Sequence, residues 1–260
     1  MMKRALQRLR LLQVFPALAA MILLAAPCAG AVSPYPQLKE KADRFFQHRE
    51  WASACALYDL MLDEKADVPS TYGQAIVANA MRRDTAAQER LMNKALDNHV
   101  PFDSVFSQVR QWSFHLGHAS LYEDFLKNTR STHPWMRRTI DAQLLRYYTF
   151  RRDGEEMMLY SRRMLDGAPD NTGFLFTLAS GQLLTGRTAE GLATLERILA
   201  IDPRHYRALV VLGNWYAQHP ASAPAGSSLA EGYLRRAYAL RPTPYVAKLL
   251  ESLARPLENS

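Results

Sequence analysis

The chain has 260 residues, of which 48% are hydrophobic and 22% charged, a composition that excludes disordered and collagen-like proteins. Its formal net charge is +7, but four of the basic residues fall within the first ten positions, at Lys3, Arg4, Arg8 and Arg10. Without them 28 basic residues face 25 acidic ones, a net charge of +3. The charge therefore gives no reason to expect a nucleic-acid partner.

The first 31 residues have the organisation of a secretory signal peptide. The basic start is followed by an apolar run, Leu11 to Ala26, and then by the small residues Ala29-Gly30-Ala31 that a signal peptidase needs. We expect cleavage after Ala31 and a periplasmic or secreted mature protein. Two alternatives are an uncleaved signal that anchors the chain, and a lipid on Cys28, which Pro27 disfavours. Association of the mature chain with the membrane surface is also left open.

Cleavage would leave Cys55 as the single cysteine of the mature chain, so no intrachain disulfide can form. Cys55 lies in the apolar run Ala54-Cys55-Ala56-Leu57-Tyr58. We expect this thiol to be buried in a helix and inert.

After residues 32–36, whose two prolines predict an extended linker, the sequence predicts helices separated by short breaks from residue 37 to residue 257. Strand patterns are nearly absent. Prolines mark the breaks at a nearly constant interval, and they stand at Pro69, Pro101, Pro134, Pro169 and Pro203. A period near 34 is the length of a helix-turn-helix repeat.

The segment Thr172 to Pro203 carries this repeat most clearly. Small residues stand at Ala179 and Gly191, where two helices could touch, and Asp202-Pro203 ends the second helix. In these features the chain resembles the tetratricopeptide repeat family, exported bacterial type. The resemblance implies an all-α, right-handed superhelical solenoid of about six helix-turn-helix repeats. A non-repetitive helical bundle is the alternative.

The remaining repeats match the family pattern less well. The unit 102–134 is the poorest, and the unit 135–169 has Glu156 where a small residue is expected. The last unit contains an insert rich in Pro, Ala and Ser between its two helices, at residues 219–227. Residues 243–257 predict a capping helix, which would cover the last repeat. Its inward residues are expected to be Tyr245, Leu249, Leu250 and Leu253.

The sequence contains no motif for catalysis, for a cofactor or for a metal. His115 and His118 are three residues apart, but Gly117 lies between them and no third ligand has a matching spacing. Glu155 and Glu156 follow Asp153-Gly154 at a predicted helix start, where acidic residues favour the helix dipole. We therefore expect a protein that is not an enzyme and that needs no cofactor.

Arginines and aromatic residues concentrate between residues 130 and 163. The arginines are Arg130, Arg137, Arg138, Arg146, Arg151, Arg152, Arg162 and Arg163. The aromatic residues are Trp135, Tyr147, Tyr148 and Phe150. Such a segment is either a solvated outer face with aromatics in the core, or a binding surface of the kind enriched at interaction hot spots.

In the tetratricopeptide family the first helix of each pair lines the concave surface. Carried over by spacing, the resemblance selects partner-binding residues Arg138, Asp141, Tyr148, Phe176, Leu183, Arg207, Val210 and Asn214. One subgroup grips a carboxylate with Lys and Asn; Asn214 fits that pattern, but Val210 stands where Lys is needed. We expect a scaffold that binds a protein or peptide of the cell envelope, in assembly or secretion. The alternative is an enzyme or polysaccharide-processing factor built on a helical solenoid.

Overall fold

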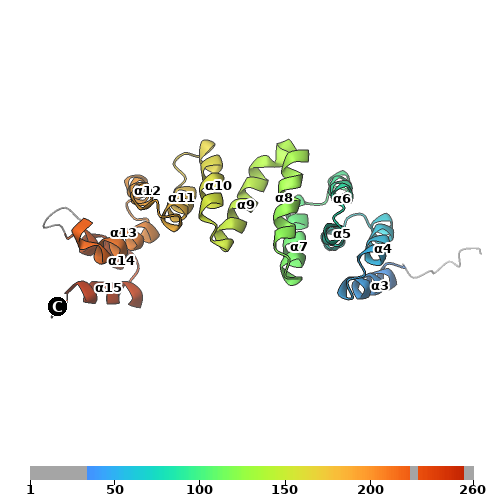
Figure 1. Ribbon diagram of the computed structural model, residues 1–260, viewed down its shortest axis with the longest axis horizontal. Coiled ribbons are helices and arrows are strands. Elements are labelled where there is room, and N and C mark those ends of the chain that lie inside the picture. The colour runs from blue at the N-terminus through green and yellow to red at the C-terminus, as the bar shows by residue number, and fades with distance from the viewer. Residues whose placement is uncertain (1–33, 223–227, 255–260) are drawn as a thin grey trace, which may run out of the picture. The chain divides into compact units, whose positions relative to one another are not determined.

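The computed structural model describes residues 34–222 and 228–254, and in these ranges it contains thirteen α-helices, α3 to α15, and no strand (Figure 1). The predicted all-α architecture is therefore confirmed. The predicted signal peptide, 1–31, lies outside the described residues. The chain divides into two compact units, 1–115 and 116–260. The boundary falls inside the repeat 102–134, whose match to the repeat pattern is the poorest.

The first unit contains five helices, α3 (Tyr35–Gln47), α4 (Trp51–Glu64), α5 (Pro69–Met81), α6 (Thr85–Asp97) and α7 (Phe102–His115). Helix α5 packs against α4, α6 and α7, and every residue from Thr71 to Asn79 is buried. Gly73 allows the approach of α7, because a Cβ at this position would collide with Gln108. Cys55 is buried, as predicted, and this burial raises the pKa of its thiol, although the nearby Arg82 acts to lower it.

Helix α3 begins at Tyr35, within the segment that we expected to be an extended linker. The prediction placed the first helical residue two positions too late because it treated both prolines as helix breakers. Pro36 stands in the first turn, where the missing N–H has no intrahelical partner to lose.

The second unit contains eight α-helices among its described residues. They are α8 (Ser120–Thr132), α9 (Arg137–Arg151), α10 (Gly154–Asp166), α11 (Thr172–Leu184), α12 (Thr188–Ile201), α13 (Tyr206–Gln218), α14 (Leu229–Leu240) and α15 (Pro244–Ala254). Short 3-10 turns stand at Pro134–Met136 and Pro220–Ser222. Each helix from α8 to α15 packs against the next helix along the chain.

A left-handed turn recurs five times along the chain, each time in the short link between two helices. Positive φ angles occur at Arg49, Arg83, Gly117, Arg152 and Gly186. Each of these positions lies one repeat length, about 34 residues, after the one before it. The same backbone conformation at the same interval shows that this turn also recurs within residues 102–169, where the sequence pattern is weak.

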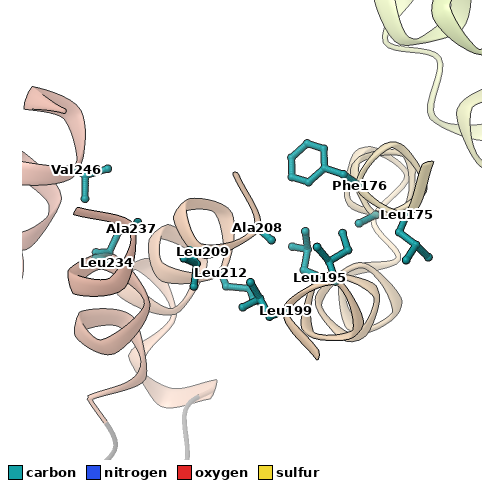
Figure 2. Packing of buried hydrophobic residues seen from close by; sticks show 12 residues of the cluster. Leu175, Phe176, Leu195, Leu199, Ala208, Leu209, Leu212, Leu234, Ala237 and Val246 are labelled. Carbon is teal, nitrogen blue, oxygen red and sulfur yellow. The ribbon is translucent and has the colours of Figure 1, made fainter. Parts of the chain in front are cut away.

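Small residues bring the two helices of a pair together in the last repeats. A Cβ at Gly191 of α12 would lie 2.8 Å from the side chain of Leu183 and 3.3 Å from the carbonyl oxygen of Ala179, both in α11. Gly213 of α13 lies in the same way against Leu234 of α14. The contact that the sequence predicted for Gly191 is therefore present. Around these contacts lies one apolar core (Figure 2), formed by α11, α12, α13, α14 and α15.

Glu156 does not occupy the small-residue position of its repeat. Arg152 and Gly186 hold the same turn position in successive repeats, and Met157 and Gly191 stand at the same distance after them. The small-residue position of this repeat is therefore Met157, which is buried. A glycine contact occurs instead between successive repeats, where Gly154 of α10 meets Gly181 of α11. A Cβ on Gly154 would lie 3.0 Å from the Gly181 carbonyl oxygen, and a Cβ on Gly181 would lie 2.8 Å from that of Gly154.

The capping helix α15 covers the last pair with a face different from the predicted one. Val246 is fully buried, and Leu249 and Leu250 pack against the core. These three residues have the i, i+3, i+4 spacing of one helix face. Tyr245, which we expected to point inward, is 55% exposed because it lies beside that face. Leu253, also expected to point inward, continues the same face but stands in the last turn of α15, and it is 37% exposed.

Candidate protein-binding face

Burial divides each first helix of the second unit, α9, α11 and α13, into a core-facing side and an open side. Equivalent positions of the three helices are related by the offset that separates Arg152 from Gly186. The core-facing positions are buried, except that Tyr216 is half-buried. Written in the order α9/α11/α13, they are Asp141/Leu175/Leu209, Leu144/Leu178/Leu212, Leu145/Ala179/Gly213 and Tyr148/Gln182/Tyr216. The open positions are partly or fully exposed except at Phe176, and they are Ala142/Phe176/Val210, Arg146/Ser180/Asn214 and Thr149/Leu183/Ala217.

Asp141 does not lie on a binding surface, contrary to the prediction. It is the equivalent of Leu175 and Leu209 and turns into the core side of α9. There its carboxylate accepts hydrogen bonds from Arg130 of α8, at 2.6 Å to Nε and 3.2 Å to Nη2. Arg163 of α10 lies 3.8 Å from the same carboxylate. Asp141 thus joins three helices, and two of the predicted surface arginines serve as its partners.

Tyr148 is also an internal residue, with only 3% of its surface exposed. Its hydroxyl donates a 2.6 Å hydrogen bond to Glu123 of α8, and its ring stacks on Tyr160 of α10 with the ring centroids 5.5 Å apart. Burial, followed by the bond to Glu123, raises the pKa of Tyr148. Burial alone would raise the pKa of Glu123, but hydrogen bonds from Lys127 and Tyr148 together lower it.

Arg138 is exposed in the first turn of α9, and its guanidinium lies against Gly167. Arg138 and Tyr148, both selected as partner-binding residues of α9, do not share one face. Ten residues correspond to about 2.8 turns at 3.6 residues per turn, so the two side chains point in clearly different directions. That angular difference is enough to place Tyr148 in the core.

Phe176 and Arg207, by contrast, are brought together. The guanidinium carbon of Arg207, on α13, lies 4.0 Å from the centroid of the Phe176 ring, on α11. Phe176 is buried under this cation, and its ring also lies 5.6 Å from that of His205. Asn214 is half-buried on the same side of α13, where its side-chain oxygen accepts from Gln218 at 3.4 Å.

The open side also carries a pocket that the sequence reasoning missed except for Leu183. Its volume is about 370 Å³, and it is lined by Thr149, Arg152, Met157, Ser180, Leu183 and Leu184. These residues come from the end of α9, the start of α10 and the second half of α11. Thr149 and Leu183 hold equivalent repeat positions, so the repeat interval was the signal that could have found the pocket.

The pocket combines an apolar wall with a cation at its edge. Leu183, Leu184 and Met157 supply the apolar surface. The hydroxyls of Thr149 and Ser180 donate to the carbonyl oxygens of Leu145 and Phe176, at 2.7 and 2.8 Å, and so leave their own oxygen lone pairs as acceptors. Such a surface can hold an aliphatic side chain together with backbone or charged groups beside it.

Other kinds of site were also considered. Among residues 34–222 and 228–254, no group of three or more His, Cys, Asp or Glu side chains is placed to hold a metal ion. None of the helices in the described part of the chain combines the length and the apolar character needed to cross a bilayer.

No protein-family model matches the sequence, and no curated protein matches it. Among solved structures, the C-terminal part of a TPR repeat-containing protein from Cytophaga hutchinsonii is 15% identical, with 82% of each chain covered and a TM-score of 0.46. A tetratricopeptide repeat protein from Parabacteroides merdae is 11% identical over 86% of each chain, with a TM-score of 0.44. YrrB, described as a TPR protein with an unusual peptide-binding site, is 15% identical over 82% of this chain and 89% of its own, with a TM-score of 0.33.

The chain is similar to tetratricopeptide repeat proteins. At these identities and TM-scores the similarity concerns the fold alone. The details that define the repeat in this chain are its own: the paired helices, the left-handed turns that recur once per repeat, and the glycine contacts at Gly191 and Gly213.

Proposed function

We propose that this chain is a scaffold that binds a protein or peptide on the open side of α9, α11 and α13. The observation that carries the proposal is the pocket between Thr149 of α9 and Leu183 and Leu184 of α11. Met157 is a buried part of its lining, but Thr149, Arg152 and Leu184 are exposed and Ser180 and Leu183 half-buried, so these side chains are available to another molecule. Leu184, for example, is 43% exposed although it is a leucine.

The chemistry of this side favours binding over catalysis. Arg207 stacked on Phe176, and Arg152 beside the apolar pocket, are combinations typical of interaction hot spots. The alternative of a polysaccharide-processing enzyme would need two carboxyl groups roughly 5–10 Å apart facing a substrate. The open positions of α9, α11 and α13 carry no acidic residue.

We further propose that the partner is a protein of the cell envelope and that the chain is exported. This part of the proposal is supported by the basic start, the apolar run and the Ala-Gly-Ala sequence of residues 1–31. N-terminal sequencing of the protein recovered from the envelope fraction tests it. A mature chain starting near Val32 is expected, and an intact Met1 in the membrane fraction would indicate an anchor instead.

The binding proposal is tested by photo-crosslinking in the cell of origin. A benzophenone amino acid is placed at Leu184, in the pocket, or at Leu159 of α10, which is 42% exposed and does not line the pocket. We expect a discrete crosslinked protein from position 184 and none from position 159. Equal products from both positions, or a product from 159 alone, would contradict the assignment of the face.

A further inference from the structure

We infer that the pocket binds an aliphatic side chain that is flanked by acidic residues within an extended segment of the partner. The inference rests on the proposed function and adds the chemistry of the ligand to it. Two properties of the site lead to it: the shape and apolarity of the pocket, and the charge around its edge.

The apolar part of the site has room for an aliphatic side chain together with the peptide backbone beside it. Its volume of about 370 Å³ is at the lower end of the range of ligand sites, about 300–1,000 Å³. Met157, Leu183 and Leu184 form its apolar wall. Behind this wall the glycines Gly154 and Gly181 are in close contact, which fixes α10 against α11. The pocket is therefore held by packed backbone rather than by mobile loops.

The edge of the pocket carries arginines that are not held in ion pairs. The ion pairs of the neighbouring elements use Arg130, Arg163 and Arg187. Within the described ranges no ion pair or side-chain hydrogen bond takes Arg152, which lines the pocket, or Arg146, which stands three residues before Thr149 on the same side of α9.

Within the described ranges the nearby acidic residues form no ion pair with these arginines and have other partners. Glu155 pairs with Arg187 at 3.5 Å, and Asp153 accepts from the backbone N–H of Glu156 as the N-cap of α10.

Two cations argue for acidic side chains on both sides of the aliphatic residue. Arg146 precedes Thr149 on α9 and Arg152 follows it in the turn after α9, so an extended segment can place one carboxylate near each of them. A chain-terminal carboxylate would satisfy only one arginine. Arginine binds carboxylates in a planar, bidentate geometry, which gives the site preference for acids over the corresponding amides.

The probes are three fluorescein-labelled twelve-residue peptides with the same Gly/Ser background. Their central sequences are Asp-Leu-Glu, Asn-Leu-Gln and Asp-Gly-Glu. Binding to the purified mature chain, residues 32–260, is measured by fluorescence anisotropy at low ionic strength. We expect the Asp-Leu-Glu peptide to bind at least about fivefold more tightly than each of the others, and its affinity to fall as salt is added.

Variants assign these preferences to the site. Arg152→Gln should remove most of the preference for Asp-Leu-Glu over Asn-Leu-Gln, whereas Arg162→Gln, which removes an exposed arginine of α10 away from the pocket, should not. Leu184→Ser should remove the preference for Leu over Gly, whereas Leu159→Ser should not. All four positions lie outside the core, and thermal melts will show that the variants fold.

The outcomes separate this inference from the proposed function. If the acidic and amide peptides bind equally but both require Leu and Leu184, the peptide-binding function stands and the inference about charge is wrong. If the Asp-Leu-Glu peptide shows no binding up to about 1 mM, a weak limit for a peptide site, the inference is overturned. The crosslinking experiment at position 184 then tests the binding function independently.

Discussion

The contact between Gly154 and Gly181 allows a quantitative test of how α10 packs on α11. In the variant Gly181→Ala the new Cβ would lie 2.8 Å from the carbonyl oxygen of Gly154, 3.0 Å from the Cγ of Met158 and 3.2 Å from the Cβ of Met157. The methionine chain can adjust, but the carbonyl oxygen belongs to the backbone of a packed helix. The two helices must therefore move apart.

The size of the effect follows from two opposing terms. Replacing glycine by alanine inside a helix stabilises it by roughly 0.8–1 kcal/mol. Overpacking a well-packed contact costs about 1–3 kcal/mol. Gly232 of α14 isolates the first term, because a Cβ there meets nothing within 4 Å. The difference between Gly181→Ala and Gly232→Ala should thus equal the packing cost alone, about 1–3 kcal/mol.

Urea denaturation of both variants, followed by circular dichroism, measures this difference. Gly232→Ala should be more stable than the wild type by up to about 1 kcal/mol. Gly181→Ala should be equal to the wild type or less stable by about 2 kcal/mol, and its melting temperature should lie roughly 2–12 °C below that of Gly232→Ala. If the two variants gained the same stability, the close approach of α10 and α11 would be wrong.

Four further changes test other parts of the structure. Tyr148→Phe removes a buried hydrogen bond to Glu123 and should lower the free energy of unfolding by about 1–3 kcal/mol without changing peptide binding; lost binding at unchanged stability would show an exposed ring. The pKa of Glu123 is lowered in the folded state, so this residue stabilises the fold above its ordinary pKa of 4.5, and the stabilisation is lost as the pH falls below that value. Glu123→Gln should therefore reduce the loss of unfolding free energy on acidification. An unchanged loss at low pH would contradict this. Arg83→Gly relieves a positive φ of 60° and should raise stability by about 0.5–1 kcal/mol in thermal melts, whereas a loss would argue against the left-handed turn. Gly191→Leu should destabilise by about 1–3 kcal/mol through overpacking against Leu183, and a melt like that of the wild type would mean that α11 and α12 do not pack as a pair.

The helices themselves were predictable because their signals are local. Prolines at regular intervals end or start helices, and the small residues at Ala179 and Gly191 mark the contact within a pair. Where the prediction of an element was wrong, the local rule had a positional exception. Pro36 is tolerated in a first helical turn, and Tyr245 of α15 lies just beside the buried stripe.

The site was predictable only in part because polar core residues look like surface residues in a sequence. Asp141 and Tyr148 are buried because Arg130 and Glu123 of the preceding helix satisfy their polar atoms. No pattern within one repeat reveals such a partner in another. Phe176 and Arg207, which the repeat spacing selected together, lie in contact, and their role in binding stays a prediction.

Hydrogen exchange of the mature chain, measured by mass spectrometry with and without the crosslinked partner, tests the central claim most directly. We predict that the partner slows amide exchange in residues 146–152 and 180–185, which hold five of the six pocket residues, and leaves α12 unchanged. Protection of α12 or of the outer side of α10, with none at 180–185, would show that the partner binds elsewhere on the repeat.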